Sequence, residues 1–485
     1  MYSNVAIFNR DVQMQPTYEE LFAQNQILIQ HIKEALLENQ QLKVEINELK
    51  KKVRDLEEKL NTNSSNSSKP SSQDPYRKPK RKKNSGKPQG AQFGHKGHAR
   101  KMIPLDQVSM VHDLKPTNCP HCKGANFNDA IVCTDIRQVV ELPDVPPQVT
   151  QYNIHTCCCG HCGKHVKADI PNEAKYGFGP RLMGLVTTLT GEFRLSKRQV
   201  TALMGKFGIK VCSGSVCKIH ERASKILETP YEDIRQYTLA QEKLNGDETS
   251  WKTLSQRRWM WVGAGCDSVF FKIKTSRSSQ AFQEVFGNFK GTLTTDRYKA
   301  YNAHEGKQQL CWSHADRDFQ KISERGGIDE AIGEELKKCA DDLFRIWNEF
   351  KGGLFSRTVL IERFEEGIIE DVKVLLKAGA MHEETHSKTK ATCVDFFDKF
   401  DSLWVFLYEE GVEPTNNRAE RVLRHGVILR KLSYGSQSET GQVFIERILT
   451  ITGTLKERAK NTLEYLTKSF KAYIEGLPAP PILEY

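Results

Sequence analysis

The sequence lacks the long apolar runs that would place a chain in a membrane. Only 38% of its 485 residues are hydrophobic, and no apolar run approaches the roughly 18–20 residues of a membrane-spanning helix. The first 16 residues hold one short apolar run, 5–8, without the basic start and longer apolar stretch of a secretory signal. We therefore expect neither a secreted nor an integral membrane protein, and the low hydrophobic content predicts segments outside any core.

The sequence also lacks the pattern of a disulfide framework. Its 13 cysteines are an odd number in a long chain. Without a secretory signal, they are expected to stay reduced or to bind metal. The length predicts about three folded units rather than a single core.

Outside one short segment, the chain has no net charge. The protein carries a formal charge of +10. Residues 69–101 hold 11 basic side chains and one acid, Asp74, so removing them from the totals of 71 basic and 61 acidic residues leaves 60 of each. A positive surplus indicates a phosphate-bearing or membrane partner, and here the surplus is confined to one stretch.

A heptad repeat extends through residues 18–60. It has leucine at most d positions and β-branched or asparagine residues at a, which favours two parallel helices whose asparagines fix the register. The unbroken spacing favours a leucine-zipper coiled coil over a helix packed on its own chain. We predict a homodimer or higher oligomer through this segment. The d positions are Leu21, Leu28, Ala35, Leu42, Leu49 and Leu56, and the a positions are Asn25, Ile32, Asn39, Ile46 and Val53.

Residues 61–101 have a polar composition that cannot bury enough apolar surface to fold, which predicts a basic flexible linker. Basic runs are often solvated tails, but 11 cations beside a dimerising coil favour nonspecific, salt-dependent contact with DNA phosphates. The predicted DNA-binding residues of this linker are Arg77, Lys78, Lys80, Arg81, Lys82 and Lys83.

Two matching cysteine pairs predict a zinc-binding module over residues 112–170. Cys119 and Cys122, and likewise Cys159 and Cys162, enclose a Cys-x-His-Cys turn followed by glycine. Two such turns facing each other would offer four thiolates to a structural Zn²⁺ ion. Incidental thiols remain the alternative, and the competing ligands are Cys157, Cys158, His121 and His161. Alternation over 131–142 and 149–156 predicts a small hairpin between the pairs.

Residues 178–230 change to helical spacing. One helix is expected to end near Phe207 and Gly208, and Ser213 or Ser215 is expected to cap a second helix that carries Lys218, His220 and Arg222. Two short helices joined by a glycine turn are similar to a helix-turn-helix, whose second helix enters the DNA major groove. A helical pair that packs without touching DNA is the alternative.

Residues 240–319 alternate as strands do. The expected strands are 242–249, 258–265, 268–275, 291–296 and 308–314, with a helix over 278–286. Three strands, a helix and a fourth strand ending in Asp match the opening of a ribonuclease H-like fold. In that fold an Asp on the first strand and one at the end of the fourth lie side by side, and these would be Asp247 and Asp296.

A third carboxylate would complete a site for two Mg²⁺ ions, which prefer oxygen ligands and would clamp the reacting oxygens of a phosphodiester. Glu420 is the best candidate, because Arg421 and Arg424 lie beside it to meet DNA phosphates. Each acid also has a structural interpretation. Asp247 lies in a turn-like Asn-Gly-Asp, Asp296 would suit a helix cap, and Asn417 with Glu420 fits a capping box.

Together these motifs resemble the insertion-sequence IS66 family of transposases, bacterial DDE enzymes that cut and rejoin DNA. The resemblance covers about residues 18–480. It implies that Asp247, Asp296 and Glu420 are the catalytic triad, with two Mg²⁺ or Mn²⁺ ions, and that a helical insertion lies between the second Asp and the Glu. Arg297 departs from the family's usual glycine. The motifs are Gly94-His-Lys-Gly97, Asp247-Glu-Thr249, Asp296-Arg-Tyr-Lys-Ala-Tyr301, Cys311-Trp-Ser-His314 and Asn416-Asn-Arg-Ala-Glu-Arg421 with Arg430-Lys431.

These observations predict a multidomain α+β transposase of the bacterial cytoplasm, associated with the nucleoid. Its partners would be element ends, target DNA, a second copy of the chain and accessory proteins of the same element, but no membrane. The alternative is a non-catalytic, zinc-containing DNA-binding protein derived from a transposase. The expected units are a coiled coil over 18–60, a linker over 61–101, a zinc module over 112–170, a helix-turn-helix-like segment over 178–230, a ribonuclease H-like catalytic domain over 240–319 and 406–435, a helical insertion over 320–405 and a C-terminal helical segment over 436–485.

Overall fold

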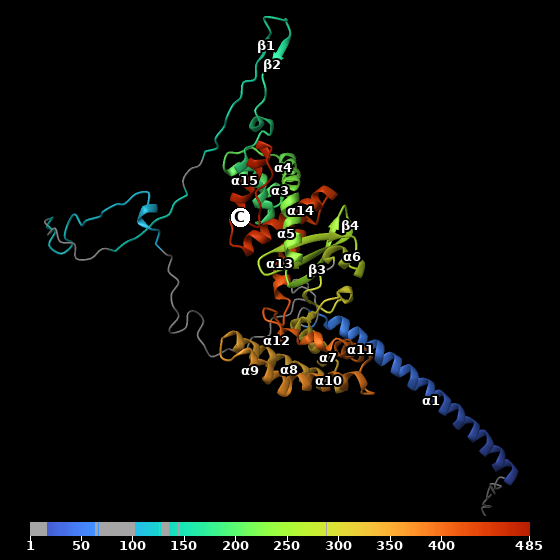
Figure 1. Ribbon diagram of the computed structural model, residues 1–485. Coiled ribbons are helices and arrows are strands. Elements are labelled where there is room, and N and C mark those ends of the chain that lie inside the picture. Colours follow the sequence, from blue (N-terminus) through green and yellow to red (C-terminus); the bar gives the residue numbers. More distant parts are fainter. Residues whose placement is uncertain are drawn as a thin grey trace, which may run out of the picture.

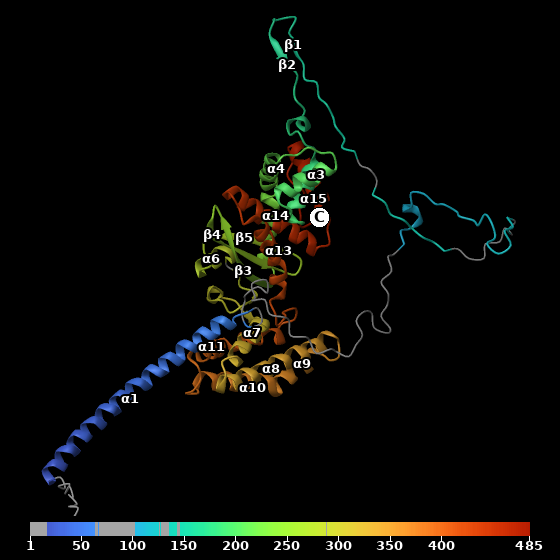
Figure 2. The ribbon, with the colours of Figure 1, turned by 180° about the vertical axis from the view of Figure 1, so that it is seen from behind.

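The computed structural model describes residues 17–63, 66, 102–125, 127, 135–142, 146–287 and 289–485. It is a mixed α+β structure with a helical N-terminal region and a sheet-containing C-terminal region. A long helix and a small hairpin project from the body in different directions (Figures 1 and 2). The predicted DNA-binding residues 77–83 lie outside the described residues.

Helix α1, Tyr18–Asn61, coincides with the predicted coil segment. Thr17 and Glu20 form a capping box that satisfies backbone N–H groups at its start. The apolar heptad side chains remain 46–57% exposed in the single chain. Coiled-coil pairing would cover this surface, and it stays a prediction. The side chains are Leu21, Leu28, Ile32, Leu42, Ile46, Leu49, Val53 and Leu56.

The last turns of α1 are attached to the body by one acid among three cations. Glu58 lies 2.6 Å from the Lys388 ammonium, 3.1 Å from the Arg325 guanidinium and 3.5 Å from the Lys321 ammonium. Partial burial raises the pKa of Glu58, but the hydrogen bonds from Lys388 and Arg325 outweigh burial and lower it to about 2. The far end of α1 lies away from the body (Figure 1).

The small hairpin does not lie where alternation predicted it. Described residues 135–142 and 149–155 form no strand, and the paired strands are β1, Thr156–Cys158, and β2, His165–Lys167. The prediction was wrong because the tight turn at Cys159–Cys162, rather than alternation, decides which segments pair: β1 and β2 are themselves exposed throughout. Val139 and Val149 are likewise exposed, at 93% and 87%. The turn around Cys159–Cys162 closes the hairpin that does form.

Helices from both ends of the body share one core. The central helix α14 contacts α4, α5 and α2, and α15 packs on α2. Segments 178–230 and 436–485 therefore fold together, through buried residues such as Val216, Ile448 and Phe470. The helices are α2, Pro180–Gly191; α3, Lys197–Lys206; α4, Ser213–Ile226; α5, Glu228–Leu239; α14, Glu439–Glu457; and α15, Thr462–Glu475.

The predicted helix pair is present as α3 and α4. Phe207 is the C-cap of α3, and Gly208 takes a positive φ of 74° in the turn that follows. The N-cap of α4 is Cys212, whose sulfur accepts the N–H of Ser215, so neither predicted serine is the cap. On α4, His220 is buried and stacks on Phe444, and this face packs inside the body.

The main sheet has five strands in the order β5-β4-β3-β6-β7. Strand β4 pairs antiparallel with both β5 and β3, while β6 and β7 run parallel to β3. Alternate residues face opposite sides: Met260 and Val262 contact α13 and α14, whereas Trp261 packs on the side of α6. The strands and helices are β3, Lys243–Thr253; β4, Gln256–Ala264; β5, Val269–Lys274; α6, Ser279–Phe286; β6, Thr292–Thr295; β7, Gln308–Leu310; and α13, Asn417–Ser433.

The segment between β7 and α13 is helical and has its own core around Trp312, Phe319, Leu343, Phe364 and Trp404. It contains the predicted insertion, 320–405, whose bounds as a separate unit stay a prediction. The helices of this segment are α7, Trp312–Ser323; α8, Gly327–Lys351; α9, Arg357–Arg363; α10, Ile369–Met381; α11, Ser387–Asp398; and α12, Val405–Tyr408.

Among all the helices that the structure describes, none combines the length and the apolar character needed to span a membrane.

Candidate functional site

Two of the predicted acids lie level with each other on adjacent parallel strands. Asp247 is within β3, and Asp296 directly follows β6. Asn245 is opposite Thr294 in the parallel register. This pairing ends at Asn245 and Thr294; continued by two residues, the same register would set Asp247 opposite Asp296, just past the end of β6. The turn that Asn245, Gly246 and Asp247 suggested is absent, because β3 continues through them.

Glu420 reaches these strands from the first turns of α13. Helix α13 begins after Asn416, whose side-chain amide donates to the Gly246 carbonyl at 2.8 Å. The Asn245 amide donates to the Asn416 oxygen at 3.0 Å. The alternative capping box with Asn417 is not formed, since Asn416 is the N-cap and makes no side-chain cap bond. Asn416 instead fixes the start of α13, and so Glu420, against the strand that carries Asp247.

Asp296 and Glu420 both act electrostatically on Asp247. Burial, together with the charges of Glu248, Asp296 and Glu420, raises the pKa of Asp247 well above its usual value. Burial also raises the pKa of Asp296, although the Tyr298 N–H, 2.9 Å from a carboxylate oxygen, acts in the opposite direction. Acids that repel in this way are stabilised by a cation between them, and carboxylate oxygens are the ligands that Mg²⁺ prefers.

The site also contains Glu248, which the sequence reasoning missed. The hydroxyl of buried Tyr301 donates to its carboxylate at 2.5 Å, and the Arg277 guanidinium lies 3.7 Å away. Burial and the nearby Asp296 raise the pKa of Glu248 to about 7. The sequence signal that could have identified Glu248 was the acidic pair Asp247-Glu248 together with Tyr301, the last residue of the motif that starts at Asp296.

His314 lies in the first turn of α7, and the prediction that it ends a strand was wrong. Strand β7 stops at Leu310, because the chain turns there into α7 with Trp312 N–H bonded to the Pro414 carbonyl. The His314 Nδ1 atom is 3.6 Å from Glu420 Oε1. Burial, with Arg317 and Arg297 nearby, lowers the pKa of His314 to about 3, so the ring is neutral at pH 7.

Two atoms of this cluster are buried without a hydrogen-bond partner, Glu420 Oε1 and His314 Nδ1. Buried carboxylate oxygens are rarely left without a hydrogen bond, and the Arg317 guanidinium, 4.0 Å away, is too far to supply one, so this Glu420 oxygen is available as a metal ligand. The ligand oxygens of Asp247, Asp296 and Glu420 do not all lie within 4.8 Å of one another, so a divalent metal held by these three residues stays a prediction.

Two kinds of basic side chain lie near the acids: some are exposed, and one forms ion pairs within the protein. Arg421 and Arg424 are exposed on α13, where a DNA phosphate would have access to them. Arg297, the departure from the family pattern, bonds to Asp318 and Asp395 and lies over the Phe396 ring. It therefore ties the turn after Asp296 to the helical insertion.

The four predicted zinc cysteines form two similar turns that lie apart. Lys123 N–H donates to the Cys119 carbonyl at 2.9 Å, and Gly163 N–H donates to the Cys159 carbonyl at 2.8 Å. Backbone N–H groups inside each turn lower the pKa of Cys119 and of Cys159. Both views place the segment that holds Cys119 and Cys122 away from the β1–β2 hairpin (Figures 1 and 2). The single four-sulfur site stays a prediction.

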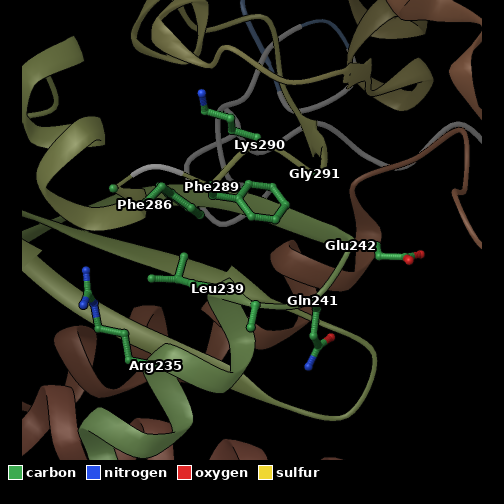
Figure 3. A pocket seen from close by; sticks show the side chains of 10 residues that line it. Arg235, Leu239, Gln241, Glu242, Phe286, Phe289, Lys290 and Gly291 are labelled. Atoms are coloured by element: carbon green, nitrogen blue, oxygen red, sulfur yellow. The ribbon is translucent and has the colours of Figure 1, made fainter.

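A surface pocket of about 480 Å³ lies near the opposite ends of the parallel strands. It is lined by Glu242 and Gly291, which directly precede β3 and β6, and by Arg235, Gln241 and Lys290 (Figure 3). The pocket does not include Asp247, Asp296 or Glu420. The carboxylates thus lie outside this pocket.

Comparisons with known proteins identify two families. A family model described as Transposase IS66 family matches residues 176–443, more than half of the chain. A model of a family of unknown function, DUF6444, matches residues 13–101. A search of curated proteins found no match.

Proposed function

Because the chain belongs to the IS66 transposase family, we propose that it is a DDE transposase that binds the ends of a mobile element, cuts them and joins them to target DNA. The observation that carries the proposal is that Asp247, Asp296 and Glu420, contributed by β3, the end of β6 and α13, lie close enough for two of them to act electrostatically on the third. These residues lie far apart in the sequence, and the charges of Asp296 and Glu420 both raise the pKa of Asp247.

The sheet supports a ribonuclease H-like catalytic domain. Three antiparallel strands are followed by a helix and two parallel strands, in the spatial order β5-β4-β3-β6-β7. Adjacent parallel strands bring the acids of β3 and β6 to one level, while α13 crosses the same sheet. This arrangement is the one expected from the motif order Asp247, Asp296, Glu420.

Asp247, Asp296 and Glu420 would hold two Mg²⁺ or Mn²⁺ ions. When bound, such ions lower the pKa of an attacking water or 3′ hydroxyl and neutralise charge on the departing 3′ oxygen. The chain's own residues orient and enclose this site. Asn416 fixes α13 against β3, and Arg421 and Arg424 would bind the DNA phosphates on either side of the cut.

The remaining segments would recognise and pair DNA. The linker 69–101 supplies an unspecific electrostatic contact, the zinc module and the α3–α4 pair would read element ends, and the coil would join two subunits. Accessory proteins of the same element remain proposed partners.

Cleavage of labelled element-end DNA tests the catalytic assignment. Asp247→Asn, Asp296→Asn and Glu420→Gln should each lower Mg²⁺-dependent cleavage by roughly 10³-fold or more, because losing a ligand removes several kcal/mol of transition-state stabilisation. DNA binding should persist. Glu242→Gln is the matched control, since Glu242 precedes β3 at its other end, and it should cleave as the unchanged protein does.

The same assay separates the alternative, a non-catalytic DNA-binding protein derived from a transposase. That protein would bind element ends and show no metal-dependent cleavage even with all three acids intact. Cleavage that survives the three substitutions would contradict the catalytic assignment itself.

A further inference from the structure

A second group of metal-ligating side chains meets beside the three carboxylates. One ligand atom each of Cys311, His314 and Glu420 lies within 4.8 Å of the others. Within the described part of the chain, no other three His, Cys, Asp or Glu side chains reach this spacing. Only Glu420 belongs to the site proposed for Mg²⁺.

The backbone fixes this geometry. Cys311 directly precedes α7 and His314 lies three residues later, so both face the same side of the helix start. Cys311 N–H donates to the Thr295 carbonyl at 2.9 Å, and the Asn416 N–H donates to the Cys311 sulfur at 3.1 Å. The starts of α7 and α13 are thereby held together, and Glu420 is brought to the pair.

The cluster has unsatisfied polar groups. Glu420 Oε1 and His314 Nδ1 are both buried without a hydrogen-bond partner and lie 3.6 Å apart, with the Arg317 guanidinium 4.0 Å from the carboxylate oxygen. Leaving such groups without a hydrogen bond destabilises the fold, and more so for a charged group. The Cys311 side chain is 2% exposed. A cation bound by all three residues would satisfy both atoms.

We propose that Cys311, His314 and Glu420 bind one Zn²⁺ ion. One sulfur, one imidazole nitrogen and one carboxylate oxygen form a three-ligand set that leaves a fourth tetrahedral position open. Binding breaks the S–H bond of Cys311, and the proton leaves to solvent. The thiolate and the carboxylate then neutralise the ion. Mg²⁺ would not use the thiolate, because it requires oxygen ligands.

Zinc binding itself does not depend on the proposed function, but its consequence does. An ion held by Cys311 and His314 occupies the carboxylate that DNA cleavage would need. Zinc at this site would therefore compete with Mg²⁺ for Glu420 and keep the transposase inactive.

Zinc counting on the full-length chain tests the site without DNA or Mg²⁺. The predicted structural zinc site is first removed by replacing Cys119, Cys122, Cys159 and Cys162 with serine, since these residues lie outside the body. The resulting protein should still bind one Zn²⁺ and release one proton per ion. X-ray absorption of the bound zinc should show one sulfur ligand with nitrogen and oxygen. Zinc with no sulfur ligand, or no bound zinc, would overturn the proposal.

Further substitutions in this background locate the ion. Cys311→Ser, which keeps an acceptor for the Asn416 N–H, and His314→Gln should each abolish stoichiometric binding. Cys393→Ser is the matched control, because Cys393 is equally buried outside this cluster, and it should bind one zinc. Equal loss of zinc binding in Cys311→Ser, His314→Gln and the control Cys393→Ser would contradict the proposed site. Wild-type cleavage that depends on the three acids, together with no zinc binding, would refute this inference and leave the proposed function intact.

Discussion

The N-terminal third and the rest of the chain bury their apolar side chains to very different extents. The heptad residues of α1 are about half exposed, and Val139 and Val149 are almost fully so. In the body, Trp251, Trp261 and Trp312 are all 0% exposed. The body therefore obtains its folding energy from its own contacts, and it can hold acids close together in a single chain. For the described residues of the N-terminal third, we expect stability to come from outside: from a second chain, metal or DNA.

Zinc removal should produce the largest difference between the two regions. A structural zinc ion contributes on the order of 10 kcal/mol to the folding of a small module. A chelator should therefore greatly speed hydrogen exchange in β1 and β2, measured by mass spectrometry, while β3 and β4 stay protected. Cys159→Ser should have the same effect, and Cys266→Ser, at an exposed cysteine of the body, should have none. Unchanged hydrogen exchange at β1 and β2 would contradict the prediction that zinc stabilises this hairpin.

Leucine truncations should separate intrachain from interchain burial. Leu449→Ala, in the core between α14 and the sheet, should lower the free energy of unfolding by about 2–5 kcal/mol at any protein concentration, followed by urea denaturation. Leu42→Ala should leave unfolding of the body unchanged and weaken dimerisation, followed by sedimentation equilibrium. A dimer insensitive to Leu42→Ala would contradict the coiled coil.

The raised pKa of Glu248 should make the free energy of unfolding of the body depend on pH. The pKa of Glu248 rises from 4.5 to about 7, so between these values the folded metal-free protein keeps a proton that the unfolded chain has lost. Its stability should fall as pH rises through this window. Glu248→Gln should remove this loss and be more stable than the unchanged protein at pH 8 by about 3 kcal/mol at most.

Urea denaturation in chelator at pH 5 and pH 8 measures this difference. Glu305→Gln, at a carboxylate whose side chain is 72% exposed, is the control and should keep the original pH dependence. Parallel pH profiles for the unchanged protein and Glu248→Gln would show that Glu248 is not protonated in the fold.

The smallest effects are expected in the salt dependence of DNA binding. Deleting 69–101 should flatten the slope of log affinity against log salt by several units, because each phosphate contact contributes about 0.9. Arg421→Gln or Arg424→Gln should each reduce it by about one unit, and Lys471→Gln on α15 should not change it. An unchanged slope after the deletion would show that the body, rather than the linker, makes the electrostatic contact with DNA.

Periodicity and motif order predicted much of the body. The strands and the helix over 242–296 lie within a few residues of their predicted ranges, because alternation there reflects true burial on both faces of a sheet. The long helix was predictable from its heptads. Asp247, Asp296 and Glu420 were selected by their order on these elements, and their catalytic role remains a prediction.

The error at His314 has a tertiary cause, a contact between distant residues. His314 was assigned to a strand because local alternation could not reveal that the Trp312 N–H bonds to Pro414, about a hundred residues away. Cys311 and Glu420 meet through the same contact. Likewise, the core shared by α2, α4, α14 and α15 joins segments that composition alone would treat as separate.

The attachment of Glu58 to Lys321, Arg325 and Lys388 makes α1 a rigid spacer with one fixed end. Its 44 residues extend about 66 Å at 1.5 Å per residue, close to two turns of duplex DNA. Parallel pairing would hold both bodies at the same end of this rod, whereas antiparallel pairing would separate them by its length. The direction of pairing, more than its strength, would decide whether a single dimer can hold two DNA ends within reach of each other.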